Sequence, residues 1–225
     1  SKKENMEEKI NYKKELENAR QAVAGIKRDG GSISLFWEIC CGDVLLAEEN
    51  AGQSTEWENA SLAAEMIDIA EYLEGYDHML NQLHTVLSRM EKILFDHPRL
   101  KLRLLELHLL VLHRIESLND HELGITEDVQ SEIRLYRYNI EQADKGNFEN
   151  IQQTGHLKHD PIEWSAEYEK VIDKASRKIE ELLQDTPRGM GFCFAYWHTK
   201  REVLSDDYGI EWRSPNIMNP GVIFD

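Results

Sequence analysis

The chain has 225 residues, of which 41% are apolar and 30% are charged, a balance typical of a globular protein with a sizeable core. Acidic residues outnumber basic residues by 42 to 26, which gives a formal net charge of −16. Such a surface repels phosphate backbones and anionic lipid, so it argues against nucleic acid and membrane partners and favours a basic protein. Alternatively, the charge serves only to keep the protein in solution.

Membrane and secretion signals are not expected from this sequence. No apolar run approaches the roughly 18 residues that a membrane-spanning helix needs, and the first residues lack the apolar core of a signal peptide. The three cysteines, Cys40, Cys41 and Cys193, form no CxxC pair. These features predict a cytoplasmic protein in a reducing compartment.

The first part of the chain has helical periodicity. Residues 4–28 carry an apolar stripe, and Gly30-Gly31 is the predicted end of that helix. Residues 32–50 contain a dense apolar run. We interpret this run as a buried helix, although Gly42 weakens a helix and leaves β-strands open as an alternative.

The strongest pattern lies in residues 62–94, where apolar residues alternate at spacings of four and three. This is the seam of a helix that packs at a period of 3.5 residues. It predicts one continuous helix from a capping box at Thr55 and Glu58 to about Phe95, against which the other helices pack. The seam consists of Leu62, Met66, Ile69, Leu73, Tyr76, Leu80, Leu83, Leu87, Met90 and Leu94.

Two further helices are expected in the middle of the chain. Pro98 marks the start of the next one, residues 99–118, whose apolar residues cover much of its circumference. The short link before Pro98 predicts an antiparallel hairpin of two long helices. Thr126 is expected to cap another helix, which fades at Lys145-Gly146.

The last third of the chain changes character twice. The polar residues 146–159 are the candidate for a surface loop or an internal boundary, and Asp160-Pro161 has the features of a helix start. Residues 189–206 read as a helix with an apolar half followed by a charged half. Residues 208–224 combine prolines with many large apolar side chains, which predicts an ordered, mostly non-helical strap.

These patterns predict an all-α fold. We expect a helical bundle of about seven helices in a single domain, residues 1–225, closed by an irregular, aromatic-rich C-terminal strap. The candidate boundary at residues 146–159 is the one place where a second domain could begin.

The C-terminal segment gathers cations and aromatic side chains within an acidic chain. If the strap folds back onto helix 189–206, these side chains could line a pocket for a carboxylate or a phosphate. The alternative is that the strap completes the core, while Arg201 and Arg213 pair with surplus acids. Cys193, among aromatic neighbours, is interpreted as a buried structural thiol. The candidate ligand-binding residues are Arg188, Tyr196, His198, Lys200, Arg201, Trp212 and Arg213.

Glu71, Glu74 and His78 are weak candidates for a metal site, because they lie within about 60° of one another on a helix. Their face points about 130° from the Leu73 seam, so we expect it to face solvent and predict no metal or other cofactor. Glu71-x-x-Glu74 also resembles the acidic motif of the all-α nucleotide pyrophosphohydrolases. Residues 86–114 lack the second acidic pair of that family.

Two pairs, Arg103 with His108 and Arg114 with His121, have an Arg and a His separated by four to six residues. This motif resembles that of the helical RNA-cleaving family known as HEPN. Arg103 and His108 lie about 140° apart on one helix and cannot converge, whereas His121 follows a helix end and could approach Arg114. Ile115 stands where the family usually has a polar residue. The resemblance implies a ribonuclease, although an acidic surface suits RNA poorly.

No complete catalytic constellation and no nucleotide-binding loop occurs in the sequence. We therefore expect a non-enzymatic interaction protein. Its partner is either a second copy, giving a dimer, or a basic protein that it neutralises in the manner of an antitoxin or immunity protein. The alternatives are a small-molecule or anion-binding protein, or an enzyme, with its site between helix 189–206 and the strap, and the HEPN-like ribonuclease.

Overall fold

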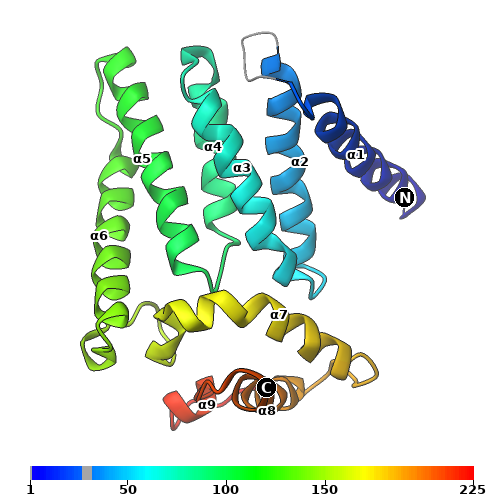
Figure 1. The fold of residues 1–225 in the computed structure, drawn as a ribbon, viewed down its shortest axis with the longest axis vertical. Coiled ribbons are helices and arrows are strands. Elements are labelled where there is room, and N and C mark those ends of the chain that lie inside the picture. Colours follow the sequence, from blue (N-terminus) through cyan, green and yellow to red (C-terminus); the bar gives the residue numbers. More distant parts are fainter. Residues whose placement is uncertain (1, 27–31) are drawn as a thin grey trace. The chain divides into compact units, whose positions relative to one another are not determined.

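The computed structural model describes residues 2–26 and 32–225, with side chains described from Tyr12 onward (Figure 1). Within these ranges there are nine α-helices and no strands, so the predicted all-α bundle is confirmed. The helices outnumber the expected seven partly because α9 (Pro215–Met218) is a single turn. The predicted helix end at Gly30-Gly31 lies outside the described residues. None of the described helices is long and apolar enough to cross a membrane.

The chain divides into two compact units. Unit 1 comprises residues 1–95 and 100–133, and unit 2 comprises residues 96–99 and 134–225. The division at residue 133 falls inside a helix, α6 (Gly124–Asp144), and not in the polar residues 146–159. The prediction of a single domain stays a prediction.

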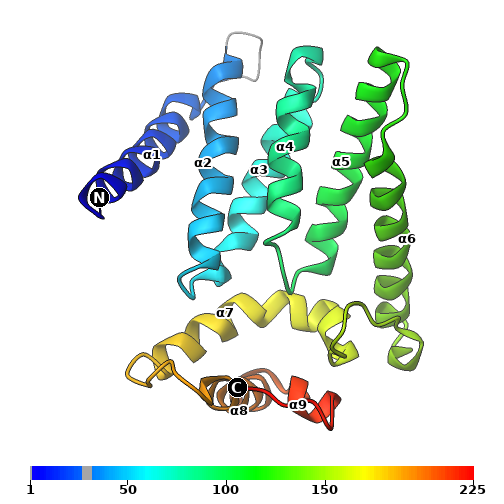
Figure 2. The ribbon, with the colours of Figure 1, turned by 180° about the vertical axis from the view of Figure 1, so that it is seen from behind.

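Unit 1 is built from consecutive helices that run alternately in opposite directions, as both views show (Figures 1 and 2). Residues 32–50 are helical, as predicted. Pro98 is the first residue of α5, and an antiparallel hairpin forms there as predicted, although its first helix is the 12-residue α4 and not a long helix. The helices of this unit are α1 (Lys2–Val23), α2 (Ile33–Ala51), α3 (Asn59–Leu73), α4 (Leu80–Glu91), most of α5 (Pro98–Asn119) and the first half of α6.

The predicted continuous helix up to Phe95 is wrong. Helix α3 ends at Leu73, the chain turns through residues 74–79, and α4 begins at Leu80. Within the turn, Tyr76 has an extended backbone with φ −108° and ψ 110°, which an α-helix cannot contain. The segment therefore forms two antiparallel helices (Figure 1).

The seam nevertheless identified the buried face, because its residues on α3 and α4 are all buried. Apolar spacing reports which side chains are covered, and the turn happens to preserve that spacing. Gly75 favours the break, since glycine in a helix interior costs about 1 kcal/mol relative to alanine. The predicted capping box is also wrong: the Thr55 hydroxyl donates to Asn50 Oδ1 at 2.9 Å, and neither Thr55 nor Glu58 caps the following helix. Likewise, α6 begins before Thr126.

A half-buried cluster of Arg20, Asp43 and Glu65 joins α1 to α2 and α3. The Arg20 guanidinium donates to the Glu65 carboxylate, with Nη2 2.7 Å and Nε 2.9 Å from Oε1, and to Asp43 Oδ1 at 3.0 Å. The Asp43 side chain is fully buried. Burial, together with the neighbouring Glu65 carboxylate, raises the pKa of Asp43 to about 9. Burial and Glu65 thus favour the protonated form of Asp43, and the Arg20 guanidinium opposes this by lowering the pKa.

Unit 2 packs α7 (Ala166–Leu182) against α8 (Phe192–Tyr208). The predicted helix start at Asp160-Pro161 is confirmed in part, because Pro161 opens a short 3-10 helix that ends before α7. The actual cap of α7 is Ser165, whose hydroxyl accepts a hydrogen bond from the Tyr168 backbone N at 3.1 Å. Gly191 precedes α8 with a φ of +82°, a conformation that glycine adopts without strain.

The C-terminal strap runs from Gly209 onward and is non-helical except for α9, as predicted. Its first half is covered: Ile210 is 8% exposed and Trp212 is 3% exposed. Its last residues are not, because Ile223 is 91% exposed. Cys193 is half-buried and its thiol donates to the Asp225 carbonyl at 3.3 Å, so the prediction of a buried thiol is wrong.

Candidate functional site

Two side chains of the strap fix its position on unit 2. The Trp212 indole N–H donates to Glu163 Oε2 at 2.9 Å. The backbone N and the Nε of Arg213 donate to Asp160 Oδ2 at 2.8 and 3.1 Å. Asp160 is only 5% exposed, and its other oxygen accepts a hydrogen bond from the Ile162 backbone N. Trp212 is thus held by a carboxylate within the 3-10 helix, and Arg213 by the carboxylate of the residue just before it.

A second attachment lies after α9. The Asn219 side chain accepts a hydrogen bond from the Lys158 backbone N and donates to the Lys158 carbonyl, both at 2.8 Å. Asn219 is 8% exposed. The Asn219 amide thus pairs with both the N–H and the C=O of Lys158. This pair of hydrogen bonds connects the strap to the polar loop before Asp160.

Below the strap, the Lys200 ammonium lies between two aromatic rings. Its Nζ is 4.3 Å from the centre of the Trp212 ring and 5.4 Å from the centre of the Tyr168 ring, both within cation–π range. Burial raises the pKa of Glu163, and the positive charge of Lys200 opposes that rise. Lys200 therefore contacts the inner face of the Trp212 ring and stabilises the charged form of Glu163.

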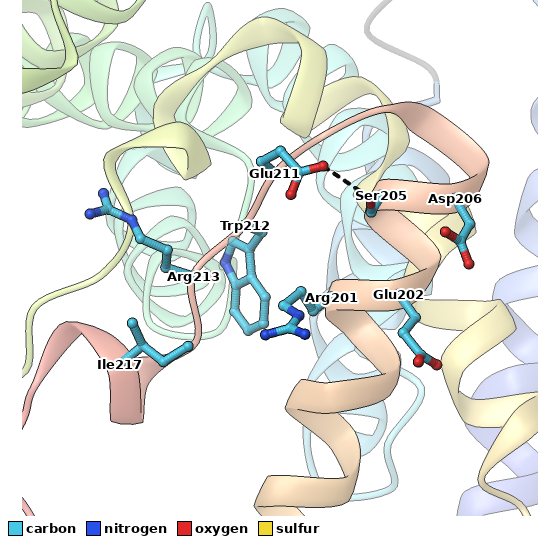
Figure 3. A pocket seen from close by; sticks show the side chains of 8 residues that line it. All are labelled: Arg201, Glu202, Ser205, Asp206, Glu211, Trp212, Arg213 and Ile217. Atoms are coloured by element: carbon cyan, nitrogen blue, oxygen red, sulfur yellow. Dashed lines mark hydrogen bonds between the residues drawn. The ribbon is translucent and has the colours of Figure 1, made fainter.

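A surface hollow of about 450 Å³ lies between α8 and the strap (Figure 3). The Trp212 ring lies in the middle of the lining, and the Arg201 side chain extends from α8 toward it. Ile217, on α9, is 50% exposed and adds apolar surface on the other side of Trp212. The lining residues are Arg201, Glu202, Ser205, Asp206, Glu211, Trp212, Arg213 and Ile217.

Acidic side chains dominate the charge of the hollow. It has three carboxylates, Glu202, Asp206 and Glu211, against two guanidinium groups. Glu211 accepts a hydrogen bond from the Ser205 hydroxyl at 3.0 Å, and Glu202 lies 3.1 Å from the exposed His198. The carboxylates of Glu202 and Asp206 are on exposed residues, so they remain accessible to a ligand.

The two arginines of the hollow differ in their partners. Arg213 is bound to Asp160, and this hydrogen bond raises the pKa of Arg213. Arg201 is exposed and has no hydrogen bond or ion pair to any residue in the described ranges. Only Arg201 therefore offers this hollow a cation that is not already neutralised.

An exposed apolar surface adjoins the beginning of α8. Phe194 is 43% exposed, and its ring packs edge-on against Trp197 with 5.6 Å between ring centres. Trp197 in turn packs against Phe224, with 5.1 Å between centres. Val222 and Ile223, just before Phe224, are 47% and 91% exposed. These five residues, Phe194, Trp197, Val222, Ile223 and Phe224, are called the aromatic patch below.

Of the seven predicted ligand-binding residues, Arg201, Trp212 and Arg213 line the hollow. Arg188 and Tyr196 do not line it. The Arg188 guanidinium lies over the Phe192 ring and is ion-paired with Glu180, and Tyr196 packs against the same ring.

His198 and Lys200 also do not line the hollow. His198 is paired with Glu202 on the surface, and Lys200 is buried. Tyr196 points about 140° away from Arg201 on α8, and the Lys200 side chain is turned inward between the Tyr168 and Trp212 rings.

The acidic half of the lining was missed by the sequence analysis, which grouped residues by positive charge. Glu202 and Asp206 are four residues apart on α8, as are Arg201 and Ser205. Such spacing places each pair on one helical face, but the two faces are about 100° apart, so the sequence pattern alone does not bring the two signs together.

The candidate metal residues of unit 1 are engaged elsewhere. Glu71 pairs with Arg103 at 3.1 Å, and Glu74 pairs with Arg114 at 2.7 Å. Within the described residues, no three His, Cys, Asp or Glu side chains come together in a way that could hold a metal ion, His78 included.

The arginine of the HEPN-like motif is held by carboxylates. Arg114 binds Glu74 and also Asp77, whose Oδ1 is 2.6 Å from Nη2. His121 is exposed and shares no hydrogen bond with Arg114. The ribonuclease interpretation stays a prediction, and no observation in the structure favours it.

No family model matches the chain, and comparisons with curated proteins and with solved structures found no match either. The argument for function therefore rests on the charges, exposure and contacts of the site itself.

Proposed function

We propose that this protein is a non-enzymatic interaction protein that binds a basic segment of a partner protein at the hollow between α8 and the strap. The observation that carries the proposal is the lining of that hollow. Its three carboxylates, Glu202, Asp206 and Glu211, exceed its single unneutralised cation, Arg201. A Lys or Arg side chain of the partner would meet this negative charge.

The rest of the molecule supports the same partner chemistry. The net charge of −16 draws basic proteins toward the surface and raises the rate at which they associate. Ile217 offers exposed apolar surface against which the aliphatic stem of a lysine or arginine can pack. Neutralisation of a basic protein in the cytoplasm, as by an antitoxin or immunity protein, is the biological role that we propose.

A second candidate is the binding of a small anion, favoured by one observation. Arg201 has no partner in the described residues and extends toward the Trp212 ring, an arrangement that suits a carboxylate on an aromatic or planar molecule. The neighbouring Glu202 and Asp206 carboxylates repel such an anion, so this candidate ranks second.

Charge reversal tests the proposal. The double variant Glu202→Lys/Asp206→Lys changes the lining, and the control Glu127→Lys/Asp128→Lys makes the same change in net charge on exposed residues of α6. The probe is a fluorescent lysine-rich peptide, and its binding is followed by anisotropy at physiological salt. We expect the lining variant to bind at least about tenfold more weakly, and the control to bind nearly as well as wild type.

Two results would contradict the proposal. Equal losses in the lining variant and the control would mean that the peptide responds only to net charge. Binding of a carboxylate dye that is lost in Arg201→Ala, without any binding of the lysine-rich peptide, would favour the anion candidate instead.

A further inference from the structure

The aromatic patch and the hollow lie on one face of α8. Phe194, Trp197, Arg201 and Ser205 follow one another at spacings of three and four and fall within about 80° on the helix. From Phe194 to Ser205 this face extends about 16 Å, the length of three helical turns. Phe194 and Trp197 belong to the patch, while Arg201 and Ser205 belong to the hollow.

The strap borders this face at both ends. Phe224 packs on Trp197 near the start of α8, and Glu211 binds Ser205 near its end. The outer face of α8 is therefore apolar at its first turns and carries Arg201 and Ser205 at its last turns. Glu202 and Asp206 of the next helical face and Glu211 of the strap lie beside those last turns, and we call the whole surface the strip.

The apolar end of the strip is unusually exposed. Ile223 is 91% exposed, and Phe194 and Val222 are each more than 40% exposed. Large apolar side chains grouped together in water mark interaction surfaces, because covering them releases ordered water at roughly 25 cal/mol per Å².

Charge decides which partner fits the strip. A second copy of this chain would bring another −16 to the same surface, and its own Glu202 and Asp206 would face carboxylates. A nucleic acid would be repelled in the same way. A segment with apolar residues at one end or on one face, and lysines or arginines beside them, complements both ends of the strip.

The secondary structure decides the form of that segment. The described residues contain no strand, so no sheet edge is offered to an extended peptide. This leaves helix-in-groove recognition, in which the anchoring side chains of a helical ligand recur at three- and four-residue spacing, as the mode that suits an elongated apolar and acidic strip.

Resting on the proposed function, we infer that the segment recognised is a basic amphipathic helix of the partner. Its apolar face covers the aromatic patch, and its basic residues reach Glu202, Asp206 and Glu211 in the hollow. Three turns of such a helix match the length of the strip.

Two peptides of identical composition test the inference. Both contain about 18 residues of leucine, lysine and alanine. In one, the leucines recur at helical spacing on a single face, and in the other the order is scrambled. Binding to the full chain is measured by fluorescence anisotropy, and helix formation on binding is followed by circular dichroism. We expect the amphipathic peptide to bind at least about tenfold tighter than the scramble.

The variant Phe194→Ser locates the binding site. This variant should bind the amphipathic peptide with nearly the same affinity as the scrambled peptide, and its affinity for the scrambled peptide should equal that of wild type. The matched control is Leu118→Ser on α5, where the leucine is 57% exposed. Circular dichroism of both variants checks that the fold is intact.

The outcomes separate the two proposals. If both peptides bind equally well, the inference is wrong and the proposed function stands. If neither binds, both are wrong. If wild type forms a dimer that Phe194→Ser dissociates, the patch belongs to a second copy and the inference is overturned. Loss of affinity in Leu118→Ser rather than in Phe194→Ser would also overturn it, because the helix would then dock elsewhere.

Discussion

Replacement of Asp43 by asparagine tests the half-buried cluster of Arg20, Asp43 and Glu65. The native state holds a proton on Asp43, whose pKa is raised from 3.8 to about 9 by burial and by Glu65. The unfolded chain releases this proton near pH 4. Stability associated with the proton is therefore complete below pH 4 and is lost as the pH rises toward 9.

The size of the effect follows from linkage. Between pH 5 and pH 8 the native state binds one more proton than the unfolded state, so the free energy of unfolding falls by about 1.4 kcal/mol per pH unit. Over this window the fall is about 4 kcal/mol. The asparagine side chain keeps the shape and the hydrogen-bonding capacity of a protonated Asp43 but cannot titrate, so the variant lacks this fall.

Urea unfolding at pH 5, 6, 7 and 8 measures the prediction for wild type and Asp43→Asn. We expect the variant to gain about 4 kcal/mol relative to wild type across the series, and Asp128→Asn, at an exposed position of α6, to follow wild type. A constant difference between wild type and Asp43→Asn at all four pH values would refute the reasoning, because Asp43 would then hold no proton in the native state.

Three further substitutions probe the contacts that position α1 and the strap. Gly42→Ala should destabilise the protein by about 1–2 kcal/mol in urea unfolding, because its Cβ would lie 2.8 Å from Leu16 Cδ1, and unchanged stability would contradict this. Asp160→Ala leaves the N–H groups of Arg213 unpaired and should cost about 2 kcal/mol, detected as faster tryptic cleavage after Arg213. Lys200→Met removes the cation near Glu163. Because the Glu163 carboxylate is charged at pH 8 and more protonated at pH 5, the loss of thermal stability should be larger at pH 8. Equal losses at the two pH values would show that the charge of Lys200 does not cause the loss.

Apolar spacing predicted the helices and their buried faces well, and the sites of failure are informative. Residues 62–94 kept one phase through the turn at 74–79, so periodicity alone could not show that the chain reverses there. The break depends on Gly75 and on the extended backbone of Tyr76, which are local features. Pro98, by contrast, acts locally and marked the start of α5 correctly.

The sequence predicted where the candidate site lies, between α8 and the strap, better than it predicted which residues line it. Large apolar residues in the strap required cover, and this requirement correctly brought Trp212 and α8 together. Tyr196 and Lys200 were included because of their chemistry, although their positions on α8 turn them away from Arg201. A choice by the helical face of Arg201 would have dropped Tyr196 and added Ser205, whereas Glu202 and Asp206 lie on a neighbouring face and were found only in the structure.

The contrast between Arg213 and Arg201 explains why α8 can serve two purposes. Arg213 binds Asp160 and holds the strap, while Lys200, on the inner side of α8, supports Trp212. The outer face of α8, which carries Phe194 and Arg201, makes neither of these contacts. We propose that a partner covers the exposed aromatic surface on this face, and the acids beside it are the reason that we expect a basic partner.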